Sequence, residues 1–167
     1  NNNGVRIMRY RVGKVPYGGR IKTLIGLKKF NRQVRETLLN DPPGLVYCHD
    51  ADTLNIGIAL KRAKSVPFVF DMHDLQHTWV RMDAPNSLPR TLVSRRFKQK
   101  MLTRAKHAEC IITSSGSIDG GSQRGFVEWL AHHGLVGNVV ENRPMPPFPE
   151  RLPRSSEGWT VGYLGRI

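Results

Sequence analysis

The sequence predicts an α/β fold with a Rossmann-like, doubly wound parallel sheet, and three observations lead to that prediction. Short apolar or β-branched runs alternate with longer segments of helical periodicity along the 167 residues. Strands separated by segments of this length are expected to pair in parallel, with a helix in each crossover. The central runs are continuously apolar, as in a sheet that helices cover on both faces.

The first half of the chain is expected to supply an edge strand, two helices and two buried strands. Residues 5–10 alternate apolar and basic side chains, a pattern typical of a half-exposed edge strand. Apolar residues at steps of three or four from Leu24 to Leu38 predict an amphipathic helix that ends before Pro42 and Pro43. Buried strands are expected at residues 45–48 and 66–70, on either side of a deeply packed helix over residues 54–64.

The second half continues the alternation. A long polar loop is expected at residues 71–87, before a basic helix over residues 88–105 whose apolar stripe includes Leu92, Val93 and Phe97. The elements expected after it are a strand over residues 110–113, a helix over 124–133 and a strand over 138–141.

The end of the chain predicts a domain boundary. Five prolines in residues 142–158 indicate a linker, and a new strand is expected to begin at residue 159. We therefore expect a Rossmann-like domain over residues 1–141 and the beginning of a second domain over residues 159–167. The first domain lacks a leading strand with a glycine-rich turn, so the chain is expected to be a fragment.

The charge balance favours polyanionic partners. The chain carries 26 Lys and Arg against 13 Asp and Glu, a net charge of +13. No apolar run approaches the roughly 18 residues of a membrane span, and two cysteines exclude a disulfide framework. The basic helix is open to three interpretations: a solvated face, an anionic-membrane contact, or, less favoured without an aromatic platform, nucleic acid. The candidate membrane contacts are Arg90, Arg95, Arg96, Lys98 and Lys100.

Polar side chains follow three of the predicted strands. His49 and Asp50 follow the first, His73 and Asp74 the second, and Ser114 the third. Ligands of open parallel sheets bind outside the carboxyl ends of the strands, so these residues are candidates for a site. Each also has a local alternative, as a helix cap, a structural histidine or a solvated loop residue. No tetrahedral set of ligands is evident, so no metal site is expected.

Five short motifs stand out along the chain: Val46–Leu54 (VYCHDADTL), Phe68–Asp74 (FVFDMHD), Ala105–Ser115, Val139–Pro144 and the Gly-Arg turn in Val161–Ile167. In this order, they resemble the N-terminal part of GT-B glycosyltransferases of family 4. The sequence contains no nucleophile elbow, P-loop or dinucleotide-binding motif, which weighs against hydrolases, P-loop proteins and dinucleotide-binding enzymes. The sequence departs from the family where Arg143 follows Asn142, because many members have glycine there.

The resemblance implies a retaining transferase that uses a nucleotide-diphosphate sugar as donor and needs neither a catalytic metal nor another cofactor. It also implies that the acceptor binds this N-terminal domain and that the donor binds mostly the C-terminal one. The implied roles are catalysis for His73, acceptor binding for His49, Asp50, Asp74 and Ser114, and contact with the donor diphosphate for Gly165 and Arg166.

Two other functions stay open from the sequence. One is a GT-B-like sugar-nucleotide epimerase, and the other is a basic module that binds nucleic acid or lipid. The expected partners are a nucleotide-sugar donor, an acceptor that is a lipid, a glycan or a small molecule, and an anionic membrane surface. The expected location is cytoplasmic, with peripheral attachment to the cytoplasmic membrane face as a further option. The 167 residues alone are expected not to turn over donor.

Overall fold

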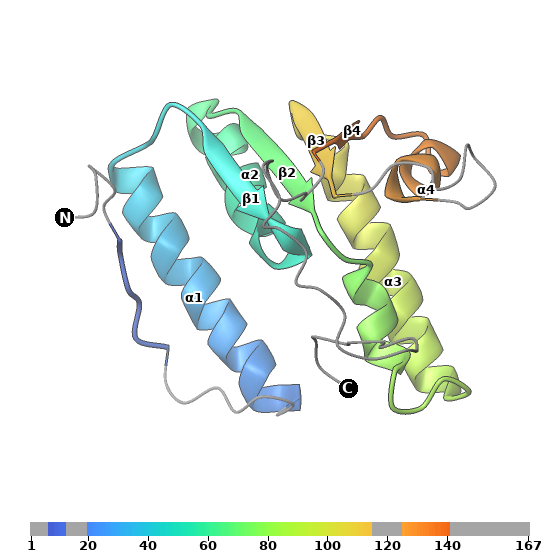
Figure 1. The fold of residues 1–167 in the computed structure, drawn as a ribbon. Coiled ribbons are helices and arrows are strands. Elements are labelled where there is room, and N and C mark those ends of the chain that lie inside the picture. The colour runs from blue at the N-terminus through green and yellow to red at the C-terminus, as the bar shows by residue number, and fades with distance from the viewer. Residues whose placement is uncertain (1–6, 13–19, 115–124, 141–167) are drawn as a thin grey trace, which may run out of the picture.

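The computed structural model describes residues 7–12, 20–114 and 125–140 of the chain. Within these residues, four strands form one parallel sheet in the order β1-β2-β3-β4, with helices in the crossovers (Figure 1). The predicted Rossmann-like α/β fold is thereby confirmed. The elements are α1 (Arg20–Asn40), β1 (Val46–His49), α2 (Asp50–Lys64), β2 (Phe68–Met72), η1 (Gln76–Arg81), α3 (Leu88–Ala105), β3 (Cys110–Thr113), α4 (Phe126–His132) and β4 (Asn138–Val139).

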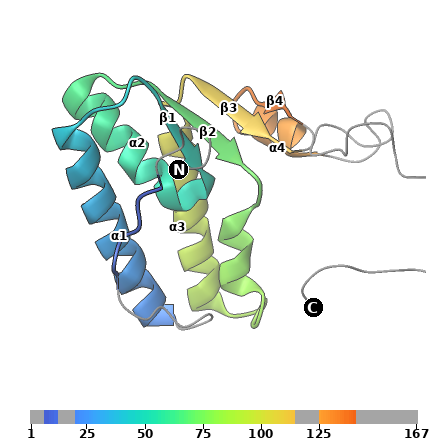
Figure 2. The ribbon, with the colours of Figure 1, turned by 60° about the vertical axis from the view of Figure 1, so that its left-hand side comes forward.

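The helices α2, α3 and α4 pack against one face of the sheet. Right-handed crossovers leave their helices on the same face when each new strand adds to the same side of the sheet. Accordingly, Phe68, Phe70 and Met72 share one core cluster with residues of all three helices. Figure 2 shows α2 and α3 on one side of β1 and β2. Within the described strands the order does not reverse, so the opposite face of β1 and β2 carries no described helix.

The contact between α2 and the sheet is very close. A Cβ added at Gly57 would lie 2.7 Å from Cys48 Sγ and 2.8 Å from the Phe68 ring. A glycine is therefore needed on the face of α2 that meets β1 and β2. On its other side α2 packs against α1, where Ile56 and Leu60 form a second buried cluster with side chains of that helix.

The apolar stripe predicted for α3 is wrong in its first half. Leu92 and Val93 are 61% and 56% exposed, whereas Ser94 is buried. The hydroxyl of Ser94 donates a 2.6 Å hydrogen bond to the carbonyl of His77 in η1, which lies in the predicted polar loop. The buried line of α3 therefore runs through Ser94, Met101 and Ala105, at helical spacing.

The N-terminal strand predicted at residues 5–10 is wrong over its described part. Residues 7–12 are irregular, and the ring of Tyr10 meets the ring of Phe30 edge-on at a centroid distance of 5.9 Å. The contact of Tyr10 with Phe30 holds this segment against α1 instead of against the sheet. The predicted linker and the strand from residue 159 lie outside the described residues. None of the described helices is long and apolar enough to cross a membrane.

Candidate functional site

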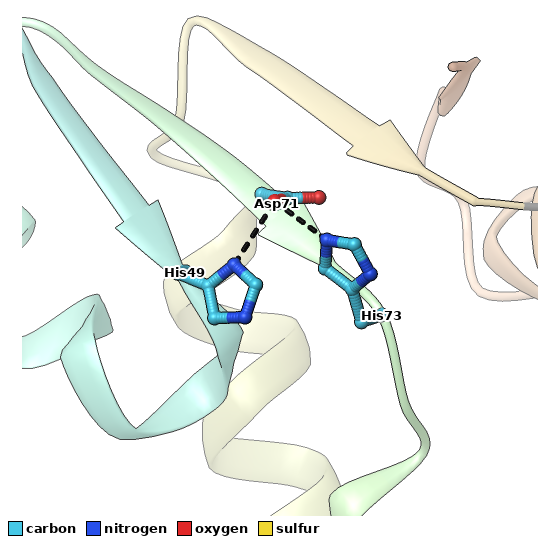
Figure 3. Close-up of side chains that lie close together, drawn as sticks. All are labelled: His49, Asp71 and His73. Carbon is cyan, nitrogen blue, oxygen red and sulfur yellow. Dashed lines mark hydrogen bonds and ion pairs between the residues drawn. The ribbon is translucent and has the colours of Figure 1, made fainter. Parts of the chain in front are cut away.

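The carboxyl ends of β1 and β2 bring three polar side chains together. His49 and Asp71 are register partners in the parallel ladder, so their side chains project from the same face. His73 follows Asp71 by two residues and returns toward the same point. The carboxylate Oδ2 of Asp71 lies 3.1 Å from His49 Nδ1 and 2.8 Å from His73 Nε2 (Figure 3). We call His49, Asp71 and His73 the His-Asp-His cluster.

Asp71 is the common acceptor of the cluster. Its residue is only 4% exposed, and it also accepts a hydrogen bond from the hydroxyl of Tyr47. Burial alone would raise the pKa of Asp71, but the hydrogen bonds from Tyr47, His73 and His49 lower that pKa below its ordinary value. The hydrogen bond between Tyr47 and Asp71 has the opposite effect on the pKa of Tyr47. The hydrogen bond to Asp71, with burial and the nearby negative charge, raises the pKa of Tyr47 to about 12.

The protons of the cluster follow from the charge of Asp71. An ionised carboxylate only accepts hydrogen bonds, so the two imidazole nitrogens that face Asp71 carry hydrogen. In a neutral imidazole the other nitrogen is then an acceptor, which is Nε2 in His49 and Nδ1 in His73. The side chains of His49 and His73 are 61% and 37% exposed. The cluster thus fixes two imidazoles against a buried anion and leaves both accessible to a ligand.

Asp50 contacts a residue at the end of each of the two strands, β1 and β2. It is the first residue of α2, directly after β1, and has a left-handed φ of 61°. Its Oδ1 accepts a hydrogen bond from the backbone nitrogen of His73 at 3.4 Å, and its Oδ2 lies 3.7 Å from His49 Nε2. Aspartate tolerates this backbone region better than most residues, and such strain persists where the surroundings hold it. Asp50 therefore contacts both histidines of the cluster.

The structure separates the other predicted acceptor residues from the cluster. Asp74 is exposed and makes no hydrogen bond or ion pair with any described residue. Ser114 follows β3, two strands away from His49 in the sheet, and is half-buried. Gly165 and Arg166 lie outside the described residues. Of the predicted residues, His49, Asp50 and His73 are those that meet at this edge of the sheet.

The sequence prediction missed Asp71 and Tyr47. A signal was present for Asp71, because it is a carboxylate inside an otherwise apolar buried strand, Phe68–Met72. Burying an unpartnered charge is costly, so such a residue must have donors around it. Tyr47 carried no comparable signal, since a tyrosine in a strand is common and its contact with Asp71 depends on the register.

The basic residues predicted to contact a membrane form two groups on α3. Arg90 makes an ion pair with Asp83 at 3.6 Å, and the ammonium of Lys98 lies 3.5 Å from His133 Nε2. The other three, Arg95, Arg96 and Lys100, are exposed. Exposed apolar side chains accompany them on α3, on η1 and directly after η1, namely Leu88, Leu92, Trp79 and Met82.

A basic groove lies on the helical side of the molecule, away from the His-Asp-His cluster. It has a volume of about 630 Å³ and runs between α1, α2 and α3. Burial lowers the pKa of Arg104, which lines this groove. The other cationic residues that line it are Lys28, Arg32, Arg35 and Arg62.

Comparisons of the chain with protein-family models, with curated proteins and with solved structures find no match.

Proposed function

We propose that the chain is the acceptor-side, N-terminal domain of a retaining GT-B glycosyltransferase that uses a nucleotide-diphosphate sugar. One observation carries the proposal. Two histidines converge on a buried aspartate at the carboxyl edge of a parallel sheet, where α/β enzymes bind their ligands. The motifs around this edge are also those that resemble family 4 of the glycosyltransferases.

His73 is the residue that we place beside the transferred sugar. In a retaining transfer the bond from the anomeric carbon to the diphosphate oxygen breaks, and a bond to the acceptor oxygen forms on the same face. The acceptor proton leaves with the diphosphate. Asp71 holds Nε2 of His73, so Nδ1 is the ring nitrogen left for a hydroxyl of the sugar. A fixed imidazole lowers the entropic cost of orienting the sugar in the transition state.

His49 and Asp50 are the residues that we place toward the acceptor, with Asp74 and Ser114 farther along the same edge. The imidazole of His49 is exposed, and the Asp50 carboxylate lies next to it. These groups suit hydroxyls of an acceptor, because imidazole and carboxylate both accept their hydrogen bonds. Gly165 and Arg166 keep their proposed role at the donor diphosphate, where a fixed cation stabilises the charge of the leaving group.

The exposed surface of α3 supports a membrane-associated acceptor. Leu88 and Leu92 share a helical face with Arg96, and Arg95 and Lys100 lie beside it. Exposed leucines next to cations suit the boundary between lipid headgroups and acyl chains. We therefore propose that α3 and η1 rest on an anionic bilayer while the edge of the sheet meets the acceptor.

The test uses the intact two-domain protein that contains these residues. A screen of nucleotide sugars with lipid and glycan acceptors is expected to give transfer with retained anomeric configuration. His73→Ala should lower kcat about 100-fold, while His107→Ala, at an exposed histidine outside the cluster, should leave it unchanged. Release of nucleotide without any acceptor would instead favour an epimerase. Equal activity of the His73→Ala and parent proteins would contradict the proposal.

A further inference from the structure

The His-Asp-His cluster has the donor set and the spacing of a metal site. His49, Asp71 and His73 each offer one ligand atom, and these three atoms lie within 4.8 Å of one another. Zinc–nitrogen and zinc–oxygen bonds are about 2.0–2.2 Å, so neighbouring ligand atoms of a tetrahedral ion are roughly 3.3 Å apart. The contacts of Asp71 with the two imidazoles, at 3.1 and 2.8 Å, are a few tenths of an ångström shorter. Small rotations of the side chains would open room for an ion.

We propose that His49 Nδ1, Asp71 Oδ2 and His73 Nε2 bind a divalent transition-metal ion of the Zn²⁺ type. Two imidazoles and one carboxylate suit zinc, cobalt and ferrous iron, whereas Mg²⁺ and Ca²⁺ prefer sites made of oxygen ligands. The ion replaces the hydrogens that now point from both imidazoles to Asp71. Because His49 and His73 are exposed, its remaining position is open to water or to an oxygen of a ligand.

The surroundings of the cluster support an ion independently of the three ligand atoms. Metal-bound histidines commonly present their other ring nitrogen to a carboxylate, which fixes the ring. Asp50 Oδ2 lies 3.7 Å from His49 Nε2, the nitrogen that faces away from Asp71. The hydroxyl of Tyr47 donates a hydrogen bond to the carboxylate of Asp71, the third proposed ligand, and so helps to fix its position. Both contacts are present without an ion.

The metal site goes beyond the proposed transfer, which requires no metal. The ion would bind Nε2 of His73, and Nδ1, the nitrogen that we place toward the sugar, would stay uncoordinated. Binding of the ion and transfer of the sugar can therefore be tested separately. A protein that transfers sugar but binds no metal would overturn this inference alone, and a protein that binds metal but transfers no sugar would overturn the proposed function alone.

The test is titration of the metal-free 167-residue chain with Co²⁺, followed by the visible absorption of the bound ion, and then competition by Zn²⁺. We expect one ion per chain, a tetrahedral or five-coordinate spectrum, displacement by Zn²⁺ and no displacement by Mg²⁺. His49→Ala, His73→Ala and Asp71→Asn should each weaken binding more than 100-fold, and Asp50→Asn about 10-fold, as for other outer contacts of metal ligands.

Two controls separate this site from histidines elsewhere on the surface. His107→Ala and His132→Ala remove exposed histidines outside the cluster and should leave the Co²⁺ affinity and spectrum unchanged. Far-ultraviolet circular dichroism checks that Asp71→Asn keeps the fold, and the exposed His49→Ala gives the same test without a buried substitution. Co²⁺ affinity that survives both His49→Ala and His73→Ala, or an octahedral spectrum in the parent chain, would overturn the inference.

Discussion

The His-Asp-His cluster and the surface of α3 are both rich in ionisable groups, but the structure holds them in different ways. In the cluster, two imidazoles share one buried carboxylate oxygen, and the strand register places His49 opposite Asp71. On α3, Arg95, Arg96 and Lys100 are exposed. The cluster therefore depends on geometry, and replacing one group by a similar one should change its properties. The α3 surface depends on charge, and a like-charged replacement there should be tolerated.

The largest effect that this comparison predicts is on binding to anionic vesicles. Neutralising Arg95, Arg96 and Lys100 together to glutamine should weaken it about 100-fold, since each cation near such a surface contributes roughly 1 kcal/mol. Arg95→Lys with Arg96→Lys should retain nearly all of the affinity, because the charge is kept. Co-sedimentation with phosphatidylserine-containing vesicles measures both. Equal binding to purely zwitterionic vesicles would show that charge does not govern this surface.

The next effect concerns α2, which begins at the cluster and packs between the sheet and α1. Gly57→Ala should lower the free energy of unfolding by about 1–3 kcal/mol, because the added methyl overlaps Cys48 and Phe68. Alanine is the better helix former by up to roughly 1 kcal/mol, so the overlap must outweigh that gain. Gly44→Ala is the matched control, since a Cβ there has no atom within 4 Å. Urea unfolding of both variants tests the expectation, which fails if the two are equally stable.

A smaller effect is expected where η1 meets α3. Ser94→Ala removes the 2.6 Å hydrogen bond to the carbonyl of His77 and should cost about 1 kcal/mol of unfolding free energy. The hydrogen bonds within the His-Asp-His cluster do not involve Ser94 or His77, so the cluster should keep its Co²⁺ affinity. Thermal unfolding and Co²⁺ titration of the same variant measure the two properties. A loss of Co²⁺ binding would mean that the two regions are coupled more strongly than their contacts indicate.

The smallest effect is a pH dependence from His77. Burial, with the charges of Lys98 and His133, lowers the pKa of His77 below its ordinary value of 6.5. The unfolded chain therefore binds more protons than the folded one as the pH falls below 6.5, and stability is lost in that range. His77→Phe keeps a ring against Trp129, which now stacks on His77 at 5.8 Å, and removes the titration. The parent chain should lose more stability than this variant on acidification. Parallel curves of stability against pH would contradict the assignment.

Much of the fold could be predicted from the sequence, because its pattern is strong at β1, β2, β3 and α2. The continuous apolar runs and the intervening helical segments left parallel pairing as the consistent arrangement. The position of Ser94 could not be predicted in this way. A serine on the buried line of α3 depends on its hydrogen bond to η1, and η1 lies in a segment whose composition indicates a loop. Tertiary contact there outweighs the local apolar pattern.

The candidate site was predictable as a place and only partly as a set of residues. The rule for parallel sheets indicates the carboxyl edge, and His49, Asp50 and His73 lie there as expected. Their common partner was not predicted, because the pairing of Asp71 with His49 depends on the register of β1 against β2. A one-residue shift of that register would turn one of the two side chains to the opposite face.

The junction between β1 and α2 has a consequence for sequence variation. His49 is the last residue of the strand and Asp50 the first of the helix, so no loop separates them. A single inserted residue here would rotate the start of α2 by roughly a quarter of a turn or more and move Asp50 away from both histidines. Homologues that keep the cluster should therefore have the same number of residues between Tyr47 and Gly57.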